Sequence, residues 1–204
     1  MYISIAGNIG SGKTTLTKLI CEEFGWKPYY EDVATNPYLS DFYNDTLRWS
    51  FNIQIYFLNK RLANIREVMS TPSGVTSVMD KSIYEDAEVF AKLLNDMGVL
   101  GDRDFDTYTS LYEQICDFIV PPKLLIYLKG SIPTLKKQIR SRGIDFEVEN
   151  INDEYLEQLN SYYNKWAEQY NKSNIISINL DEYDIINCPS DMKKIFNTIS
   201  DSVS

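Results

Sequence analysis

The chain has 204 residues, a formal net charge of −9 and 44% hydrophobic residues. This length fits one α/β domain with a substantial core. The acidic balance argues against a dedicated nucleic-acid-binding protein, which normally carries a basic face, and suits a small neutral substrate. Histidine is absent and the three cysteines have no paired spacing, which argues against a zinc site and histidine-based catalysis.

The sequence also bears on the compartment of the protein. No apolar run approaches membrane-spanning length, and the amino terminus is predicted to form a core strand instead of a signal peptide. Unpaired cysteines are typical of a reducing compartment. We therefore expect a cytoplasmic protein with neither a membrane nor a nucleic acid as its partner.

The first predicted strand, residues 2–6, leads into a phosphate-binding loop. Residues 7–15 read GNIGSGKTT, which contains the pattern G-x-x-x-x-G-K-[ST], and a helix is predicted over 13–24. Loop N–H groups and the helix N-terminus would face phosphates, Lys13 would add positive charge, and the Thr14 hydroxyl could bind Mg²⁺. We expect a nucleoside triphosphate to contact Gly7, Asn8, Ile9, Gly10, Ser11, Gly12, Lys13, Thr14 and Thr15.

The rest of the chain alternates strands with helices. Further strands are predicted at 27–30, 75–80, 123–128 and 174–178, and further helices at 46–69, 83–97, 104–118, 131–141, 153–171 and 190–201. Long helical crossovers between strands predict a five-stranded parallel sheet flanked by helices. We expect a single domain over 1–204, with a flexible lid at about 140–152 where the pattern is most irregular.

Two strand ends carry candidate catalytic residues, because ligands of parallel α/β sheets collect at the carboxyl ends of the strands. Glu31 follows the second strand and could accept a proton from a hydroxyl that attacks a γ-phosphate; otherwise it is a helix-capping or solvated acid. Asp80 ends the third strand and could hold Mg²⁺ through water, and Lys81 could meet a phosphate or the attacking oxygen. Residues 80–82 also suit a simple N-cap, and both interpretations can hold together.

The helix at 46–69 carries a candidate nucleobase site. Gln54 and Arg61 are seven residues apart and share one face, and Tyr43 lies eleven residues before Gln54. An amide donates and accepts at once, which suits the edge of a base, and Asp86 could pair with Arg61. The alternative is a solvated helix face, but the surrounding residues are apolar, and buried polar groups need partners.

Two arginines precede the predicted lid. Arg140 and Arg142 could cover a transferred phosphoryl group and neutralise its charge. Alternatively, they complement the dipole at the carboxyl end of a helix.

The spaced residues together resemble the deoxyribonucleoside kinases of the deoxycytidine, deoxyguanosine and deoxyadenosine kinase group, along nearly the whole chain. The resemblance rests on Gly-Asn-Ile in the phosphate loop, Glu31, Tyr43, Arg48-Trp49-Ser50-Phe51, Gln54, Arg61, Asp80 and Asp86, in identity and in spacing. The shorter bacterial members, with Asn36-Pro37-Tyr38-Leu39 after the acid, are most similar, and among these the chain most resembles a mycoplasmal deoxyadenosine kinase, partly in composition.

The resemblance implies a P-loop kinase-like three-layer sandwich and an activity. The γ-phosphate of ATP, with Mg²⁺, would pass to the 5′-hydroxyl of a deoxyribonucleoside in nucleotide salvage. Deoxyadenosine is the expected substrate, with deoxyguanosine and deoxycytidine as further candidates. Members of the family are homodimers, and the helices at 46–69 and 83–97 are the expected interface.

The resemblance also implies roles for single residues. Glu31 would be the general base; Gln54 and Asp86 would read the nucleobase with support from Arg61. The 3′-hydroxyl of the sugar would meet Tyr43 and Glu147, and Ile9, Val33 and Phe90 would form pocket walls, with Phe90 stacking on the base. The segment 179–182, which includes Asp181, would cover the adenine of the donor.

The chain departs from the family pattern at two positions. Lys81 stands where the family usually has arginine, and it keeps the charge but loses the bidentate fork. Ile144 stands where a second lid arginine is expected; Arg142 aligns well, and Arg140 is a candidate substitute. The choice between Asp145 and Glu147 for the sugar stays open.

Two other functions fit a phosphate loop. A nucleoside monophosphate kinase of the thymidylate type would need a cation for the phosphate of its acceptor, which Glu31 would repel. A nucleotide-triggered regulatory switch would need a loop that senses the γ-phosphate and a residue that orients water. Acceptance of a nucleoside, with turnover, would distinguish the kinase from both.

Overall fold

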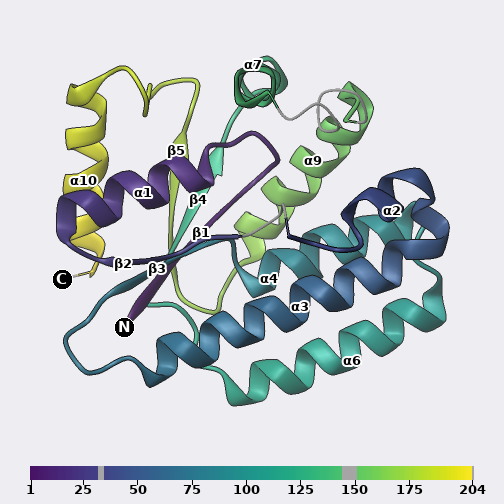
Figure 1. Cartoon of the computed structure of the whole chain (residues 1–204). Helices are drawn as coiled ribbons and strands as arrows, with labels where there is room; N and C mark the ends of the chain where they lie inside the picture. Colours follow the sequence, from purple (N-terminus) through teal and green to yellow (C-terminus); the bar gives the residue numbers. More distant parts are fainter. Residues whose placement is uncertain (32–34, 144–150, 204) are drawn as a thin grey trace. The chain divides into compact units, whose positions relative to one another are not determined.

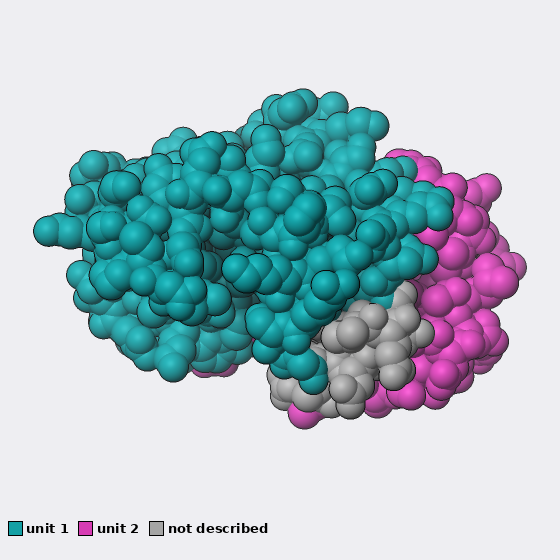
Figure 2. Space-filling model, turned by 90° about the horizontal axis from the view of Figure 1, so that it is seen from above, with its two compact units in different colours: residues 1–30, 72–81, 121–204 teal, residues 31–71, 82–120 magenta. Residues whose placement is uncertain are grey.

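The computed structural model describes residues 1–31, 35–143 and 151–203, and it divides into two compact units. Unit 1 contains residues 1–30, 72–81 and 121–204, and unit 2 contains residues 31–71 and 82–120 (Figure 2). Each unit is therefore built from segments that are separated along the chain.

A five-stranded sheet forms the centre of unit 1 (Figure 1). Its strands are β1 (Tyr2–Gly7), β2 (Lys27–Tyr29), β3 (Ser77–Asp80), β4 (Leu124–Lys129) and β5 (Asn174–Asn179). The order across the sheet is β2-β3-β1-β4-β5, and every neighbouring pair is parallel. The predicted parallel sheet flanked by helices is confirmed, with strand bounds close to those expected.

Helices of unit 1 cover both faces of the sheet. On one face, α1 (Lys13–Phe24) and α10 (Pro189–Val203) pack on β1 and β4 in an apolar cluster that includes Ile5, Leu16, Ile126 and Ile195. Successive strand residues point to opposite faces, so Tyr127 lies on the other face. There it stacks on Tyr163 of α9 (Asp153–Gln169), with ring centroids 6.1 Å apart. Within its described residues, unit 1 also contains α7 (Ile132–Arg142).

Unit 2 is helical within its described residues. It contains α2 (Leu39–Asn44), α3 (Thr46–Ser70), α4 (Ile83–Glu85), the π-helix η1 (Asp86–Ala91), α5 (Lys92–Asp96) and α6 (Asp102–Phe118). The sequence did not predict α2, and the single helix expected at 83–97 is interrupted by the wide turn of η1. Such turns frequently lie at functional sites.

A capping box starts the segment that leads into η1. Ser82 Oγ accepts a hydrogen bond from the Tyr84 amide at 3.1 Å, and Glu85 Oε1 accepts one from the Ser82 amide at 2.7 Å. The predicted N-cap at the end of the third strand is thus present at Ser82, and it fixes where α4 begins.

Among the described residues, no helix is both long enough and apolar enough to span a membrane.

Candidate active site

The phosphate loop of unit 1 depends on glycine at its first position. A Cβ atom on Gly7, whose φ is 155°, would lie 2.6 Å from Ser11 Oγ and 2.8 Å from the Leu128 carbonyl oxygen. At the other end of the loop, Gly12 caps α1 with a φ of 78°. The chain can therefore turn tightly into the N-terminus of α1, where helix amides favour an anion.

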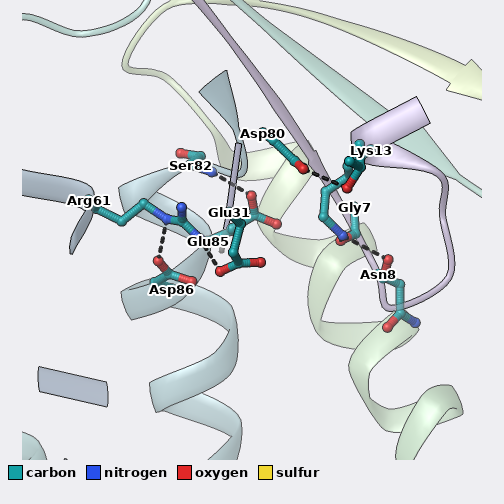
Figure 3. A network of polar contacts seen from close by, with 10 residues as sticks. Gly7, Asn8, Lys13, Glu31, Arg61, Asp80, Ser82, Glu85 and Asp86 are labelled. Carbon is teal, nitrogen blue, oxygen red and sulfur yellow. Dashed lines mark hydrogen bonds and ion pairs between the residues drawn. The ribbon is translucent and has the colours of Figure 1, made fainter. Parts of the chain in front are cut away.

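Two side chains hold the loop in shape. Lys13 Nζ donates to the carbonyl oxygens of Gly7 at 2.8 Å and Asn8 at 3.1 Å (Figure 3). Asn8 accepts from the Ile9 amide at 2.7 Å and donates to α9, at the Leu156 carbonyl (3.1 Å) and at Asn160 Oδ1 (3.0 Å). The Asn8 side chain therefore anchors the loop to α9, a role that its sequence position did not predict.

Thr14 and Asp80, a pair of residues suited to bind a metal ion, lie beside this loop. Thr14 Oγ1 donates to Asp80 Oδ2 at 2.6 Å, and Asp80 is 2% exposed at the end of β3. Hydroxyl and carboxylate oxygens are the hard ligands that Mg²⁺ prefers, directly or through water. The residues present therefore fit the magnesium site expected from the sequence.

Replacing Gly7 with alanine should lower the affinity for a nucleoside triphosphate by at least about tenfold, because the added methyl group meets the Leu128 backbone and strains the loop. Titration with a fluorescent triphosphate analogue measures the change. Gly25→Ala is the matched control: Gly25 also has a positive φ, 67°, but no atom lies within 4 Å of an added Cβ. Equal binding by the two variants would contradict the role of Gly7.

A buried ionic cluster occupies unit 2. Arg61 of α3 is 2% exposed; its Nε donates to Asp86 Oδ2 at 3.0 Å, and its Nη2 donates to Glu31 Oε1 (Figure 3). Asp86, at the start of η1, is 1% exposed. The predicted pair of Arg61 with Asp86 is present. The second partner of Arg61, Glu31, was not predicted. One guanidinium therefore contacts both the candidate general base, Glu31, and the candidate base-reading acid, Asp86.

Gln54 of unit 2 has a buried acceptor atom that is unfilled. Gln54 of α3 is 5% exposed, and its Oε1 atom is buried without a hydrogen-bond partner in the described part of the chain. A buried acceptor without a partner is costly, and such a group in a native fold calls for an explanation. Gln54 is therefore suited to accept a hydrogen bond from a ligand.

The comparisons with known proteins agree with this geometry. The sequence model of the family described as "Deoxynucleoside kinase" matches residues 3–204. The chain is 36% identical to a deoxyadenosine/deoxycytidine kinase of Bacillus subtilis, over 97% of this chain and 91% of that protein. It is 35% identical to a deoxyadenosine kinase of Lactobacillus acidophilus, over 98% of this chain and 95% of that protein. The chain belongs to the deoxynucleoside kinase family.

A solved structure supports the same assignment. The deoxyadenosine kinase of M. mycoides, bound to dCMP and dCDP, superposes with a TM-score of 0.86 at 27% identity, over 98% of this chain and 100% of that one. The expected family, fold and activity are confirmed: the protein is a kinase that phosphorylates deoxynucleosides in salvage and binds a nucleoside triphosphate.

Lys81 of the kinase has an unusual backbone. It is 7% exposed and has a φ of 91°, the only positive φ of a non-glycine residue in the described ranges. Its amide donates to the Ile5 carbonyl at 2.9 Å, which ties the end of β3 to β1. Side chains held in such strained conformations cluster at functional sites.

The other predicted site residues differ in burial and lie on different elements. Arg140 and Arg142 are exposed in the last turn of α7, and Tyr43 is half-buried in α2. Phe90 is half-buried in η1, the π-helix that begins with Asp86. Val33 and Glu147 lie outside the described residues.

Asp181 of the kinase lies in the exposed turn after β5. Its carboxylate accepts hydrogen bonds from Ser131 and Thr134 at the start of α7. The bond from Thr134 contributes most to holding the pKa of Asp181 below its ordinary value, followed among the lowering causes by those from Ser131. The sequence did not predict these partners.

The buried thiol of unit 1 has no place in the chemistry. Burial, with a smaller contribution from Glu22, raises the pKa of Cys21 to about 11. The thiolate is the reactive form, so Cys21 is unreactive near neutral pH.

Proposed function

We propose that the kinase transfers the γ-phosphate of ATP to the 5′-hydroxyl of deoxyadenosine, with Glu31 as the general base. The unfilled acceptor of Gln54, together with the buried Arg61–Asp86 pair in the same unit, carries the choice of base. The relatives named for deoxyadenosine are consistent with this choice.

The hydrogen-bond groups of unit 2 favour a base with an amino group. Gln54 Oε1 is an empty acceptor, and its amide nitrogen is a donor. Arg61 directs its Nε and Nη2 donors to Asp86 and Glu31. The 6-amino group and neighbouring ring nitrogen of adenine complement such an amide, as do the corresponding groups of cytosine. Guanine and thymine present a carbonyl oxygen in place of the amino group.

Glu31 is suited to proton transfer because its orientation is fixed. Arg61 holds one carboxylate oxygen, and the side chain of Glu31 keeps 14% exposure. In our proposal, the carboxylate accepts the proton of the 5′-hydroxyl as that oxygen attacks the γ-phosphate. Tyr43 and Glu147 would hold the 3′-hydroxyl of the sugar, and Ile9, Val33 and Phe90 would line the pocket.

The phosphate side of the reaction is assigned to unit 1. The loop from Gly7 to Thr15 would bind the phosphates, and Lys13, Lys81, Arg140 and Arg142 would neutralise charge on the transferred group. Thr14 and Asp80 would hold Mg²⁺, which would supply positive charge beside the transferred phosphoryl group. The donor set described above is consistent with this assignment.

We infer that the kinase is a homodimer. Unit 2 exposes large apolar side chains on α3, where Leu47 is 70% exposed, and on α6, where Phe118 is 82% exposed. Large exposed apolar side chains are candidates for contact with another subunit. Sedimentation velocity should give the mass of a dimer, and a monomeric mass at micromolar concentration would contradict the inference.

Deoxyadenosine and deoxyinosine form the sharpest substrate pair, because they differ only at one edge of the base: the 6-amino group becomes a 6-oxo group, and the neighbouring ring nitrogen gains a proton. We expect kcat/KM for deoxyinosine to fall by roughly a hundredfold or more, since the analogue leaves the buried Gln54 acceptor unpaired. Steady-state kinetics at saturating ATP-Mg measures the ratio. Gln54→Leu should reduce the discrimination. Equal turnover of both nucleosides by the unsubstituted enzyme would contradict the proposed base choice.

A further inference from the structure

The first turn of α7 is capped by a residue from a distant part of the chain. Ser131 is the N-cap residue, but its side chain makes no capping bond to the helix backbone. Asp181 provides a carboxylate instead: it accepts from the Ser131 amide at 3.0 Å, from Ser131 Oγ at 2.8 Å and from Thr134 Oγ1 at 2.5 Å. Asp181 therefore acts like the acidic member of a capping box, across 50 residues of sequence.

The position of this carboxylate is electrostatically favourable. A negative group at a helix N-terminus interacts well with the macrodipole. Because the pKa of Asp181 is lowered, the group stays ionised at pH values at which an ordinary aspartate begins to protonate. The contact is lost only as the pH falls through that lowered pKa, so it is intact near neutral pH.

The helix that Asp181 caps packs directly on the phosphate loop. A Cβ atom on Gly10 would lie 2.7 Å from the Leu135 carbonyl oxygen and 2.7 Å from Ile139 Cγ1. Loop backbone and helix backbone are thus in close contact, with no side chain between them on the loop side. A shift of α7 would therefore move either the loop or the groups that touch it.

The turn that contains Asp181 also reaches the phosphate loop by itself. Ile185 in this turn is 3% exposed. A Cβ atom added to Gly12 would lie 3.1 Å from Ile185 Cδ1 and 3.1 Å from Gln138 Oε1 of α7. The turn after β5, helix α7 and the phosphate loop therefore form one packed group within unit 1.

The opposite end of α7 carries the two arginines assigned to the phosphoryl group. Arg140 and Arg142 lie in its last turn, and the Lys136–Asp153 ion pair joins the middle of α7 to the first residue of α9. An α-helix rises about 1.5 Å per residue, so a change at the first turn displaces the arginines as part of one rigid element.

We propose that Asp181 is a positioning residue for the phosphate donor: it fixes α7, and through α7 it sets the phosphate loop and the two arginines. This inference rests on the proposed function, because it takes ATP as the donor. It also reassigns Asp181, which the sequence suggested as a nucleotide contact. Its carboxylate is engaged by α7, and its charge would repel a phosphate.

A double-mutant cycle tests the role of Asp181. Asp181→Ala removes all three hydrogen bonds at the start of α7, and it should raise KM for ATP by about three- to tenfold, the size expected from a lost helix cap. Thr134→Val removes one of these bonds and should raise KM for ATP by a smaller factor. KM for ATP in the double variant should equal that in Asp181→Ala, because Asp181→Ala already removes the bond from Thr134. KM for deoxyadenosine should stay within about twofold of the unsubstituted value. Asp201→Asn, at an exposed position of α10, removes the same charge and should change none of these values.

The outcomes are separable. A rise in KM for ATP in Asp181→Ala with no rise at all in Thr134→Val would identify Asp181 as a direct nucleotide contact and overturn the inference. Unchanged KM for ATP in both variants, with thermal unfolding like that of the unsubstituted protein, would overturn it as well. Parallel rises in both KM values would indicate a general loss of structure, which also contradicts a specific donor role. Absence of nucleoside phosphorylation by the unsubstituted protein would instead refute the proposed function.

Discussion

Glu31→Gln is expected to lower kcat by at least about a hundredfold, the loss typical of a removed general base. The amide keeps the size and shape of the carboxylate, but it cannot accept the proton of the 5′-hydroxyl. Its oxygen can still accept a hydrogen bond from Arg61, so the ion pair becomes a hydrogen bond from the guanidinium to a neutral amide, without loss of packing. Steady-state kinetics with deoxyadenosine and ATP-Mg gives kcat, and calorimetry gives the nucleoside affinity.

The control for this variant is Glu22→Gln, which removes the same charge at an exposed position of α1. It should leave kcat within about twofold of the unsubstituted value. Retention of most activity by Glu31→Gln would show that another group accepts the proton, and the Arg61–Glu31 pair would then have a structural role alone.

Arg61→Leu should lower the free energy of unfolding by about 3–5 kcal/mol, the cost of removing one partner from a buried ionic cluster. The substitution leaves the Glu31 and Asp86 carboxylates without their shared cation, and Asp86 is 1% exposed. Urea denaturation followed by circular dichroism measures the loss.

A second variant separates the lost charge from lost packing. In Arg61→Leu combined with Asp86→Leu, the more buried of the two carboxylate partners is removed as well, and part of the stability should return. Arg66→Leu, at an exposed position on the same helix, should change stability by less than about 0.5 kcal/mol. A loss below about 1 kcal/mol in Arg61→Leu would contradict a buried ionic cluster at this position.

The features that the sequence predicted have local signals. The phosphate loop is a contiguous pattern between a strand and a helix, and the five strands follow from apolar runs between helical patterns. The Arg61–Asp86 pair was also foreseeable, because Arg61 lies on one helix face with Gln54, and a buried arginine needs an acid.

The features that the sequence did not predict depend on long-range contacts. Glu31 meets Arg61 across 30 residues, and Asp181 meets Ser131 across 50, so no local pattern reports either contact. The interruption of the helix at 83–97 by η1 is hidden for another reason: its apolar spacing resembles that of a continuous helix, whereas the π-turn arises from packing.

Identification of the phosphorylated product by ³¹P NMR tests the proposed reaction most directly. Incubation with ATP-Mg and deoxyadenosine should give ADP and deoxyadenosine 5′-monophosphate in equal amounts, with no further conversion when the monophosphate is supplied as the acceptor. Release of inorganic phosphate without a nucleotide product, or growth of a diphosphate from the monophosphate, would contradict transfer to the 5′-hydroxyl of a nucleoside.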